Sequence, residues 1–190
     1  MADVVSFDAF YGATRRRMVA YAFALTGDAG EAQDAAQEAY ARAWEHWRTV
    51  RDLGDREAWV RTVVWRIAAN RWRHLAAGAR AAVRLGPAVT TSTETSWERV
   101  SLVAALQQLP DVQRRAIALR YLYDLTVAEV ADETGVPVGT VKSRLSRGLE
   151  ALSELLGDPV VEGLDVEPLD ERKGELDRAS ARWAVEGDHA

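Results

Sequence analysis

The chain has 190 residues and a formal net charge of −5 at pH 7, with few glycines and prolines and no cysteine. This composition favours an all-helical protein of one medium or two small domains, and it excludes disulfides, thiolate metal sites and cysteine catalysis. No apolar run approaches the roughly 20 residues of a membrane span, and the acidic N-terminus does not resemble a signal peptide. The sequence therefore predicts a soluble, cytoplasmic protein without membrane insertion.

The charge is unevenly distributed along the chain. Residues 158–190 hold ten acidic and four basic side chains, a net charge of −6, whereas residues 1–156 carry a net charge of +1. We therefore expect a near-neutral body with local basic patches, followed over 157–190 by an acidic tail with one candidate amphipathic helix.

Three helices are predicted in the first part of the chain. Apolar residues recur at helical spacing over 6–26, and Gly27 ends that helix. A D-x-x-E start signal opens a second helix over 28–47. The polar stretch 48–56 is predicted to be a loop, and a third helix follows over about 55–75.

Three side chains on the second helix form an acid–amide patch: Asp34, Gln37 and Glu38. They lie about one turn apart, and no cation lies among them, so we interpret the patch as uncompensated. Such a patch is compatible with a basic partner. Ordinary solvated surface acids are the simpler interpretation when residue chemistry is considered alone.

The third helix has two contrasting faces. Its predicted core face holds Trp59, Val60, Val63, Val64 and Ile67. The opposite face is an outer stripe of two indoles flanked by three guanidinium groups, namely Trp65, Trp72, Arg61, Arg66 and Arg73. Aromatic faces interleaved with cations suit unstacked nucleic-acid bases. Packing of one or both indoles against the first or second helix explains the stripe equally well.

The stretch 76–96 differs from its flanks, because it contains Gly, Pro, Ser and Thr and shows no sustained apolar period. We predict a flexible linker there. Two helices follow, over 97–109 and from Pro110 to about residue 123. The second of them is expected to turn four apolar residues inward: Val112, Ile117, Leu119 and Leu122.

The stretch 125–149 predicts two short helices joined by a tight turn. Thr126 and Glu129 have the spacing of a capping box, and Gly135 suits the left-handed position that ends a helix. A helix from about Val138 places three apolar residues on one face, Val141, Leu145 and Leu149. This pattern predicts a helix-turn-helix whose second helix enters a DNA major groove. A packed helical hairpin with a solvated basic face is the alternative.

Three segments in this order resemble one protein family. Residues 34–44, DAAQEAYARAW, resemble D-L-V-Q-E-x-F-x-R-A-W, and residues 58–73 resemble a promoter-melting helix. Residues 109–147 resemble L-P-x-x-x-R…T-x-x-E-[IV]-A…G-V-P-x-G-T-V-K-S-R-L-x-R. The family is that of the bacterial extracytoplasmic-function (ECF) sigma factors of RNA polymerase. The resemblance implies an all-α fold, with a sigma region 2-like domain over 1–75 and a sigma region 4-like helix-turn-helix domain over 97–156.

The resemblance also implies promoter-specific transcription initiation and roles for particular residues. The clamp helices of the large polymerase subunit are expected to bind Asp34, Gln37 and Glu38. Capture of an unpaired base of the −10 promoter element is expected from the loop 50–56 and from Arg61, Trp65, Arg66 and Arg73. Reading of the duplex −35 element is expected from Thr140, Lys142, Ser143, Arg144 and Arg147, with Thr140 near the phosphates.

One position departs from the family pattern, since many relatives carry Asn where this chain has Arg66. Asn offers a base edge both a donor and an acceptor, whereas Arg only donates, so the identity of the −10 base stays open. The family further implies that the helix-turn-helix domain docks on the polymerase flap. An anti-sigma protein is a further candidate partner.

Two other function classes compete with this interpretation. A LuxR-like transcriptional regulator would share the TVK segment, but an acid–amide second helix and a basic tryptophan helix are not expected there. For an enzyme, the three histidines lie in different segments, and the sequence has neither a glycine-rich phosphate loop nor an H-E-x-x-H motif. The sequence therefore predicts a protein that is not an enzyme, with no cofactor, no metal and no small-molecule substrate.

Overall fold

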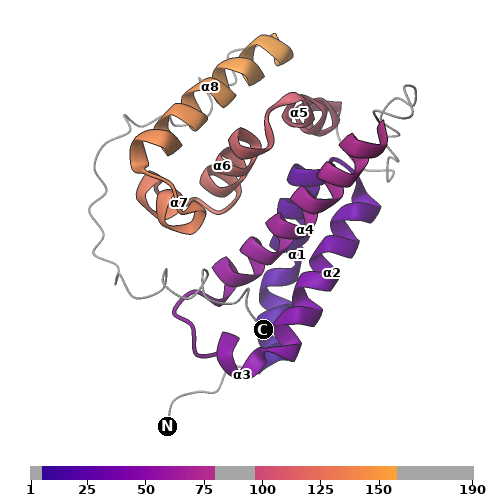
Figure 1. Ribbon diagram of the computed structural model, residues 1–190, viewed down its shortest axis with the longest axis vertical. Coiled ribbons are helices and arrows are strands. Elements are labelled where there is room, and N and C mark those ends of the chain that lie inside the picture. The colour runs from indigo at the N-terminus through magenta and orange to yellow at the C-terminus, as the bar shows by residue number, and fades with distance from the viewer. Residues whose placement is uncertain (1–5, 80–96, 158–190) are drawn as a thin grey trace.

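The computed structural model describes residues 6–79 and 97–157, and within these ranges every regular element is an α-helix. The helices are α1 (Phe7–Thr26), α2 (Ala29–Glu45), α3 (Trp47–Val50), α4 (Arg56–Ala79), α5 (Trp97–Gln108), α6 (Asp111–Leu122), α7 (Val127–Thr134) and α8 (Val138–Leu156). Helices α1 to α4 form an N-terminal domain, and α5 to α8 form a helix-turn-helix domain (Figure 1). The predicted all-α fold with two small helical domains is confirmed.

Two helix boundaries differ from the sequence-based expectation. The second helix ends at Glu45, because His46 leaves the helical conformation with φ −104° and ψ 18°. Helix α3 then runs from the predicted end of the second helix, Trp47, into the predicted loop. Helix α4 continues past Leu75 to Ala79, since a single Gly78 among alanines does not end a helix. The remaining predicted linker, 80–96, and the acidic tail, 158–190, lie outside the described residues.

The predicted helix ends are confirmed at the positions where capping chemistry was decisive. The Asp28 carboxylate accepts a hydrogen bond from the backbone N–H of Glu31 at 2.8 Å. Thr126 and Glu129 form the complete capping box of α7. Gly135 has φ 67°, a left-handed conformation that costs glycine little.

The core of the N-terminal domain lies where α1, α2 and α4 meet. Met18 and Tyr21 of α1 are fully buried, and α4 contributes its predicted core face, with Val60 and Val64 at 0% exposure. Helix α2 approaches α1 and α4 closely, because the side chains that it buries are mostly alanines, Ala32, Ala35, Ala36, Ala39 and Ala43. Trp44, on the same helix, lies outside this core and is 62% exposed.

The core of the helix-turn-helix domain is built on α6. Leu119 is fully buried, as are Val130 of α7 and Val141 of α8. Helix α8 crosses α6 at Gly148, where an added Cβ would lie 2.7 Å from Cδ1 of Ile117. A side chain at that position would separate the two helices.

The inward face predicted for α6 is half right. Ile117 and Leu119 are buried, but Val112 and Leu122 are 37% and 40% exposed. The helix instead buries Arg114 and Arg115. These arginines face the N-terminal domain, because α6 and α5 pack against α1. Helix α8 packs on α5, α6 and α7, and lies on the side of its domain away from the N-terminal helices (Figure 1).

Candidate nucleic-acid interfaces

The acid–amide patch lies on the outer face of α2. Asp34 and Gln37 are exposed, and Glu38 is partly exposed. Our description of the patch as uncompensated was wrong, because Arg42, one turn further on, donates a hydrogen bond to the Glu38 carboxylate at 2.5 Å. The remaining acceptors still face solvent, so the patch can receive a basic or hydrogen-bond-donating partner.

An exposed tryptophan extends this face of α2. Trp44 lies two turns after Gln37, and its ring meets Phe7 edge to face with centroids 5.0 Å apart. The Phe7 ring also meets Trp47 at 5.2 Å. The sequence-based prediction missed Trp44, although its i+7 spacing from Gln37 was a signal that could have placed it beside the patch.

The five residues predicted to read duplex DNA come together on the first half of α8. Thr140, Lys142, Ser143 and Arg144 are partly exposed, and Arg147 is exposed. Val141 and Leu145 point into the core between them. The N-terminal half of α8 thus carries an outer face of cationic and hydroxyl-bearing side chains. In a recognition helix, this half contacts the bases and phosphates.

The outer stripe of α4 is not free in this structure. Arg61 is only 3% exposed, and Trp65 is partly buried. Arg66 is exposed, while Arg73 and Trp72 belong to α4 but their side chains lie outside the described part. The stripe therefore divides into a portion covered by the helix-turn-helix domain and a solvent-exposed portion at Arg66.

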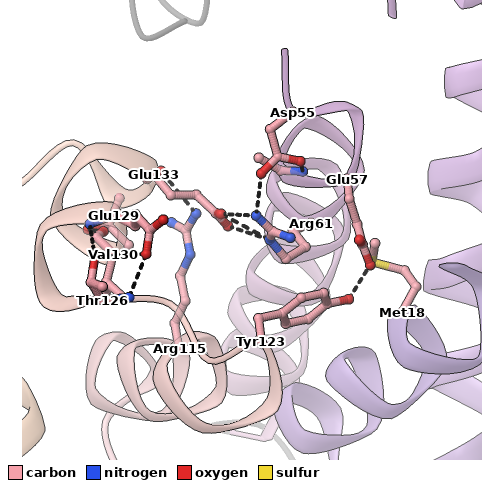
Figure 2. Close-up of polar contacts among 12 residues, drawn as sticks. Met18, Asp55, Glu57, Arg61, Arg115, Tyr123, Thr126, Glu129, Val130 and Glu133 are labelled. Atoms are coloured by element: carbon pink, nitrogen blue, oxygen red, sulfur yellow. Dashed lines mark hydrogen bonds and ion pairs between the residues drawn. The ribbon is translucent and has the colours of Figure 1, made fainter. Parts of the chain in front are cut away.

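Arg61 is held by carboxylates from both domains. Its Nε and Nη2 donate to the carboxylate of Glu133, on α7, at 2.9 and 2.6 Å, and Nη2 also lies 3.2 Å from Oδ2 of Asp55 (Figure 2). The Glu133 side chain is 6% exposed. Burial by itself lowers the pKa of Arg61, but the hydrogen bonds and charge of Glu133 outweigh it and raise that pKa above its usual value. Arg61 therefore stays charged.

Tyr123 lies between two cations at the same contact. Its ring centroid is 4.6 Å from Cζ of Arg17 and 4.4 Å from Cζ of Arg61. Its hydroxyl donates to the Met18 sulfur at 3.7 Å (Figure 2). Burial raises the pKa of Tyr123, so the hydroxyl remains protonated and available as a donor. One aromatic ring thus links α6 to both α1 and α4.

The helix-turn-helix domain also caps the C-terminus of α1. Gln107 donates from Nε2 to the carbonyl of Ala24 at 3.1 Å, and Arg114 donates to the carbonyl of Leu25. These are carbonyls of the last turn, which lack partners within the helix. Glycine is favoured at position 27 for two reasons. Its φ is +74°, and an added Cβ would lie 2.6 Å from Cγ of Gln107.

Sequence reasoning missed all the residues that the second domain contributes to this contact. A signal was present on α6. Arg114 lies three residues before Ile117, and Arg115 four before Leu119, so helical spacing places both arginines on the buried face. No local pattern marks Glu133, whose partner lies 72 residues earlier in the chain.

Comparison with known proteins places this geometry in a family. Residues 10–77 match the model of sigma-70 region 2, and residues 99–152 match that of sigma-70 region 4. The ECF RNA polymerase sigma factor SigK of Mycolicibacterium vanbaalenii is 30% identical over 164 residues, which is 82% of this chain and 84% of that protein. This chain belongs to the ECF sigma factor family. It therefore functions as an RNA polymerase sigma factor.

Other relatives agree with this assignment. SigK of Mycobacterium ulcerans is 33% identical over 80% of this sigma factor and 86% of its own length. The RNA polymerase sigma-E factor of Streptomyces coelicolor is 29% identical over 92% and 98% of the two chains. The LuxR-like alternative finds no support among the comparisons.

A solved structure has the same fold as this sigma factor. It is the sigma factor RpoE of Bartonella quintana in complex with the anti-sigma factor NepR, at 24% identity and a TM-score of 0.69. The likeness covers 80% of this chain and 96% of that one, so it extends over both domains. Within the described residues, no helix is both long enough and apolar enough to cross a membrane.

Proposed function

We propose that this sigma factor binds core RNA polymerase through the α2 face, reads the duplex −35 element with α8, and captures the unpaired −10 strand with the outer stripe of α4. The observation that carries the proposal is the placement of these three surfaces on three different helices. Each is matched to the chemistry of its target: acceptors for a basic protein surface, cations on a recognition helix for duplex DNA, and indole with guanidinium for single-stranded bases.

The division of the surfaces between two domains explains how weak contacts give a specific complex. Neither domain is strongly basic, so each alone is expected to bind DNA weakly. Polymerase holds both domains on one scaffold, which makes the second DNA contact intramolecular and raises its effective concentration. Arg66 supplies only donors to the −10 base, in place of the Asn of many relatives, and is therefore expected to select a base with acceptors on the exposed edge.

The same reasoning extends to the partners and the setting of the protein. We propose that it acts without catalysing a reaction and without a cofactor, and that it works in the cytoplasm on promoter DNA bound to polymerase. The solved neighbour RpoE is complexed with an anti-sigma factor. An anti-sigma protein is accordingly a proposed partner of this chain, and the polymerase flap is a proposed contact of the helix-turn-helix domain.

Reconstituted transcription tests this function. Purified core polymerase, genomic template and the full chain should give run-off transcripts whose 5′ ends share −35 and −10 sequences. Core polymerase alone should not give them. If the chain instead shifted a duplex tightly without polymerase and added no promoter-dependent transcript, sigma activity would be refuted in favour of a regulator.

Loss of two cations from α8 should weaken the −35 contact. We expect Lys142→Ala with Arg147→Ala to lower promoter-dependent transcription by about 5- to 150-fold, the equivalent of about 1–3 kcal/mol for one good base contact. The measurement compares two templates, one with the mapped −35 element and one with that element scrambled. The defect should be large on the first template and small on the second; equal defects on both would contradict base reading by these residues.

A further inference from the structure

We propose that the acidic segment 158–171 of this chain docks on the cationic outer face of α8, formed by Lys142, Arg144 and Arg147. There it occupies the face that duplex DNA would otherwise bind, and it limits DNA binding by the free sigma factor. The docking depends on charge and reach alone. Its competition with DNA rests on the −35 role proposed above for α8.

The three cations of α8 have no acidic partner within the described residues. Arg147 is exposed, Lys142 and Arg144 are partly exposed, and none of them forms an ion pair there. By contrast, Arg17 and Arg42, exposed arginines of α1 and α2, each pair with a glutamate. Helix α8 packs on α5, α6 and α7 from one side, so its outer face can receive an anionic ligand (Figure 1).

The segment that follows α8 has the complementary charge. Residues 158–171, DPVVEGLDVEPLDE, hold six acidic and no basic side chains. Residues 172–190 hold four acidic and four basic side chains and are neutral overall. The whole net charge of −6 on the tail therefore lies in its first part, next to α8. Charge complementarity selects 158–171, and not the rest of the tail, as the occupant of the cationic face.

The segment also begins within reach of the cations. Helix α8 ends at Leu156, and Gly157 leaves the helix with φ 67°. At about 1.5 Å of rise per residue, Arg147 lies about 15 Å and Lys142 about 22 Å back along the helix from this point. An extended chain covers about 3.3 Å per residue, so about seven residues reach Lys142. Such a short tether gives an effective concentration of about millimolar, which offsets the weakness of individual surface ion pairs.

Two further features set where the segment binds and when it leaves. The last two turns of α8 carry the exposed acids Glu150 and Glu154, which repel the segment and direct it to the first half of the helix. Duplex DNA carries one negative charge per about 1.7 Å, a higher density than that of six carboxylates on an extended chain. Promoter DNA held on polymerase therefore displaces the segment, whereas encounters of the free chain with DNA are suppressed.

Carbodiimide crosslinking of the full chain tests the docking directly. This reagent joins an amine to a carboxylate that is in contact with it. The chain has only two lysines, Lys142 on α8 and Lys173 in the tail, so a crosslink from the recognition helix is assigned without ambiguity by peptide mass spectrometry. We expect Lys142 to be joined to acids of 158–171. Lys142→Arg keeps the charge but removes the amine, and it should abolish these crosslinks.

A mixture of ¹⁴N- and ¹⁵N-labelled chains shows whether each crosslink lies within one molecule. Crosslinks within one chain support the proposal. If Lys142 formed no crosslink to 158–171, or formed such crosslinks only between two chains, docking of a chain's own segment would be overturned.

Neutralising the segment should release the cationic face. The released variant of the full chain carries Glu162→Gln, Asp165→Asn, Glu167→Gln and Asp170→Asn. Its matched control carries Glu175→Gln, Asp177→Asn, Glu186→Gln and Asp188→Asn, the same change in net charge in the neutral part of the tail. Binding is measured by fluorescence anisotropy with a labelled duplex that lacks a −35 element.

We expect the released variant to bind the duplex about fivefold more tightly than the wild-type chain, as it would if the segment covered α8 about four-fifths of the time. The control should change the affinity by less than about twofold, because 172–190 has no excess of acids to dock. Equal affinities of the two variants would overturn the competition with DNA. Crosslinking needs neither DNA nor polymerase, and the run-off assay on the unmodified chain reports sigma activity by itself. Failure of the proposed function is therefore distinguishable from failure of the docking.

Discussion

Charge reversal of Asp34 and Glu38 to arginine is expected to abolish binding to core RNA polymerase. Both side chains lie on the solvent face of α2, and neither belongs to the domain core. Reversal places two cations against the basic surface that the proposed contact requires, and like charges brought together at an interface cost several kcal/mol. We expect a loss in affinity of at least about 100-fold, measured by co-purification and by fluorescence anisotropy with core polymerase.

The control for this experiment is a pair of acidic residues with the same spacing on a different helix. Glu150 and Glu154 are also exposed acids four residues apart on one helix, α8. Their double reversal to arginine changes the net charge equally and leaves the α2 face unchanged, so it should weaken polymerase binding much less than the α2 reversal does. Because Glu38 pairs with Arg42, its reversal also costs α2 about 0.2–0.5 kcal/mol from like charges at i,i+4. Circular dichroism should show that α2 remains folded; normal binding by a folded reversal variant would refute the polymerase-contact role.

Leu119→Ala is expected to have the largest effect on stability. Leu119 is fully buried on α6, against which α7 and α8 pack. Deleting its side chain removes buried apolar surface and leaves a cavity, with a loss of about 2–5 kcal/mol in the free energy of unfolding. A loss of this size is comparable with the whole stability of a small domain, so −35 binding should disappear with it.

A substitution three residues further on provides the matched control. Leu122 lies on the same helix but is 40% exposed, so Leu122→Ala should cost about 1 kcal/mol or less. Urea denaturation followed by circular dichroism measures both variants. Equal losses for the two substitutions would contradict the orientation of α6 seen in this structure.

These two leucines also show how far sequence reasoning reached. Both have the apolar character and the approximate spacing of an inward face, and both were predicted to be buried. The structure distinguishes them, because α6 does not pack against one partner. It contacts α8 and α7 on one side and α1 of the other domain on another, and Arg114 and Arg115 occupy the second of these faces. A single apolar periodicity in the sequence cannot show which side of α6 packs against its own domain and which side packs against the other domain.

The amino-acid sequence by itself determined the helices other than the short α3, their caps and the recognition helix. Capping at Asp28, Thr126 and Gly135, and the apolar stripe of α8, are local properties that depend on residues within one or two turns. The tertiary structure alone decided the state of the α4 stripe. Arg61 and Trp65 have the chemistry of a DNA contact, but Glu133 and Arg115 cover them. The physical reason is that an ion pair between residues 61 and 133 depends on the packing of two domains. The residues next to each partner in the sequence therefore do not indicate that the pair forms.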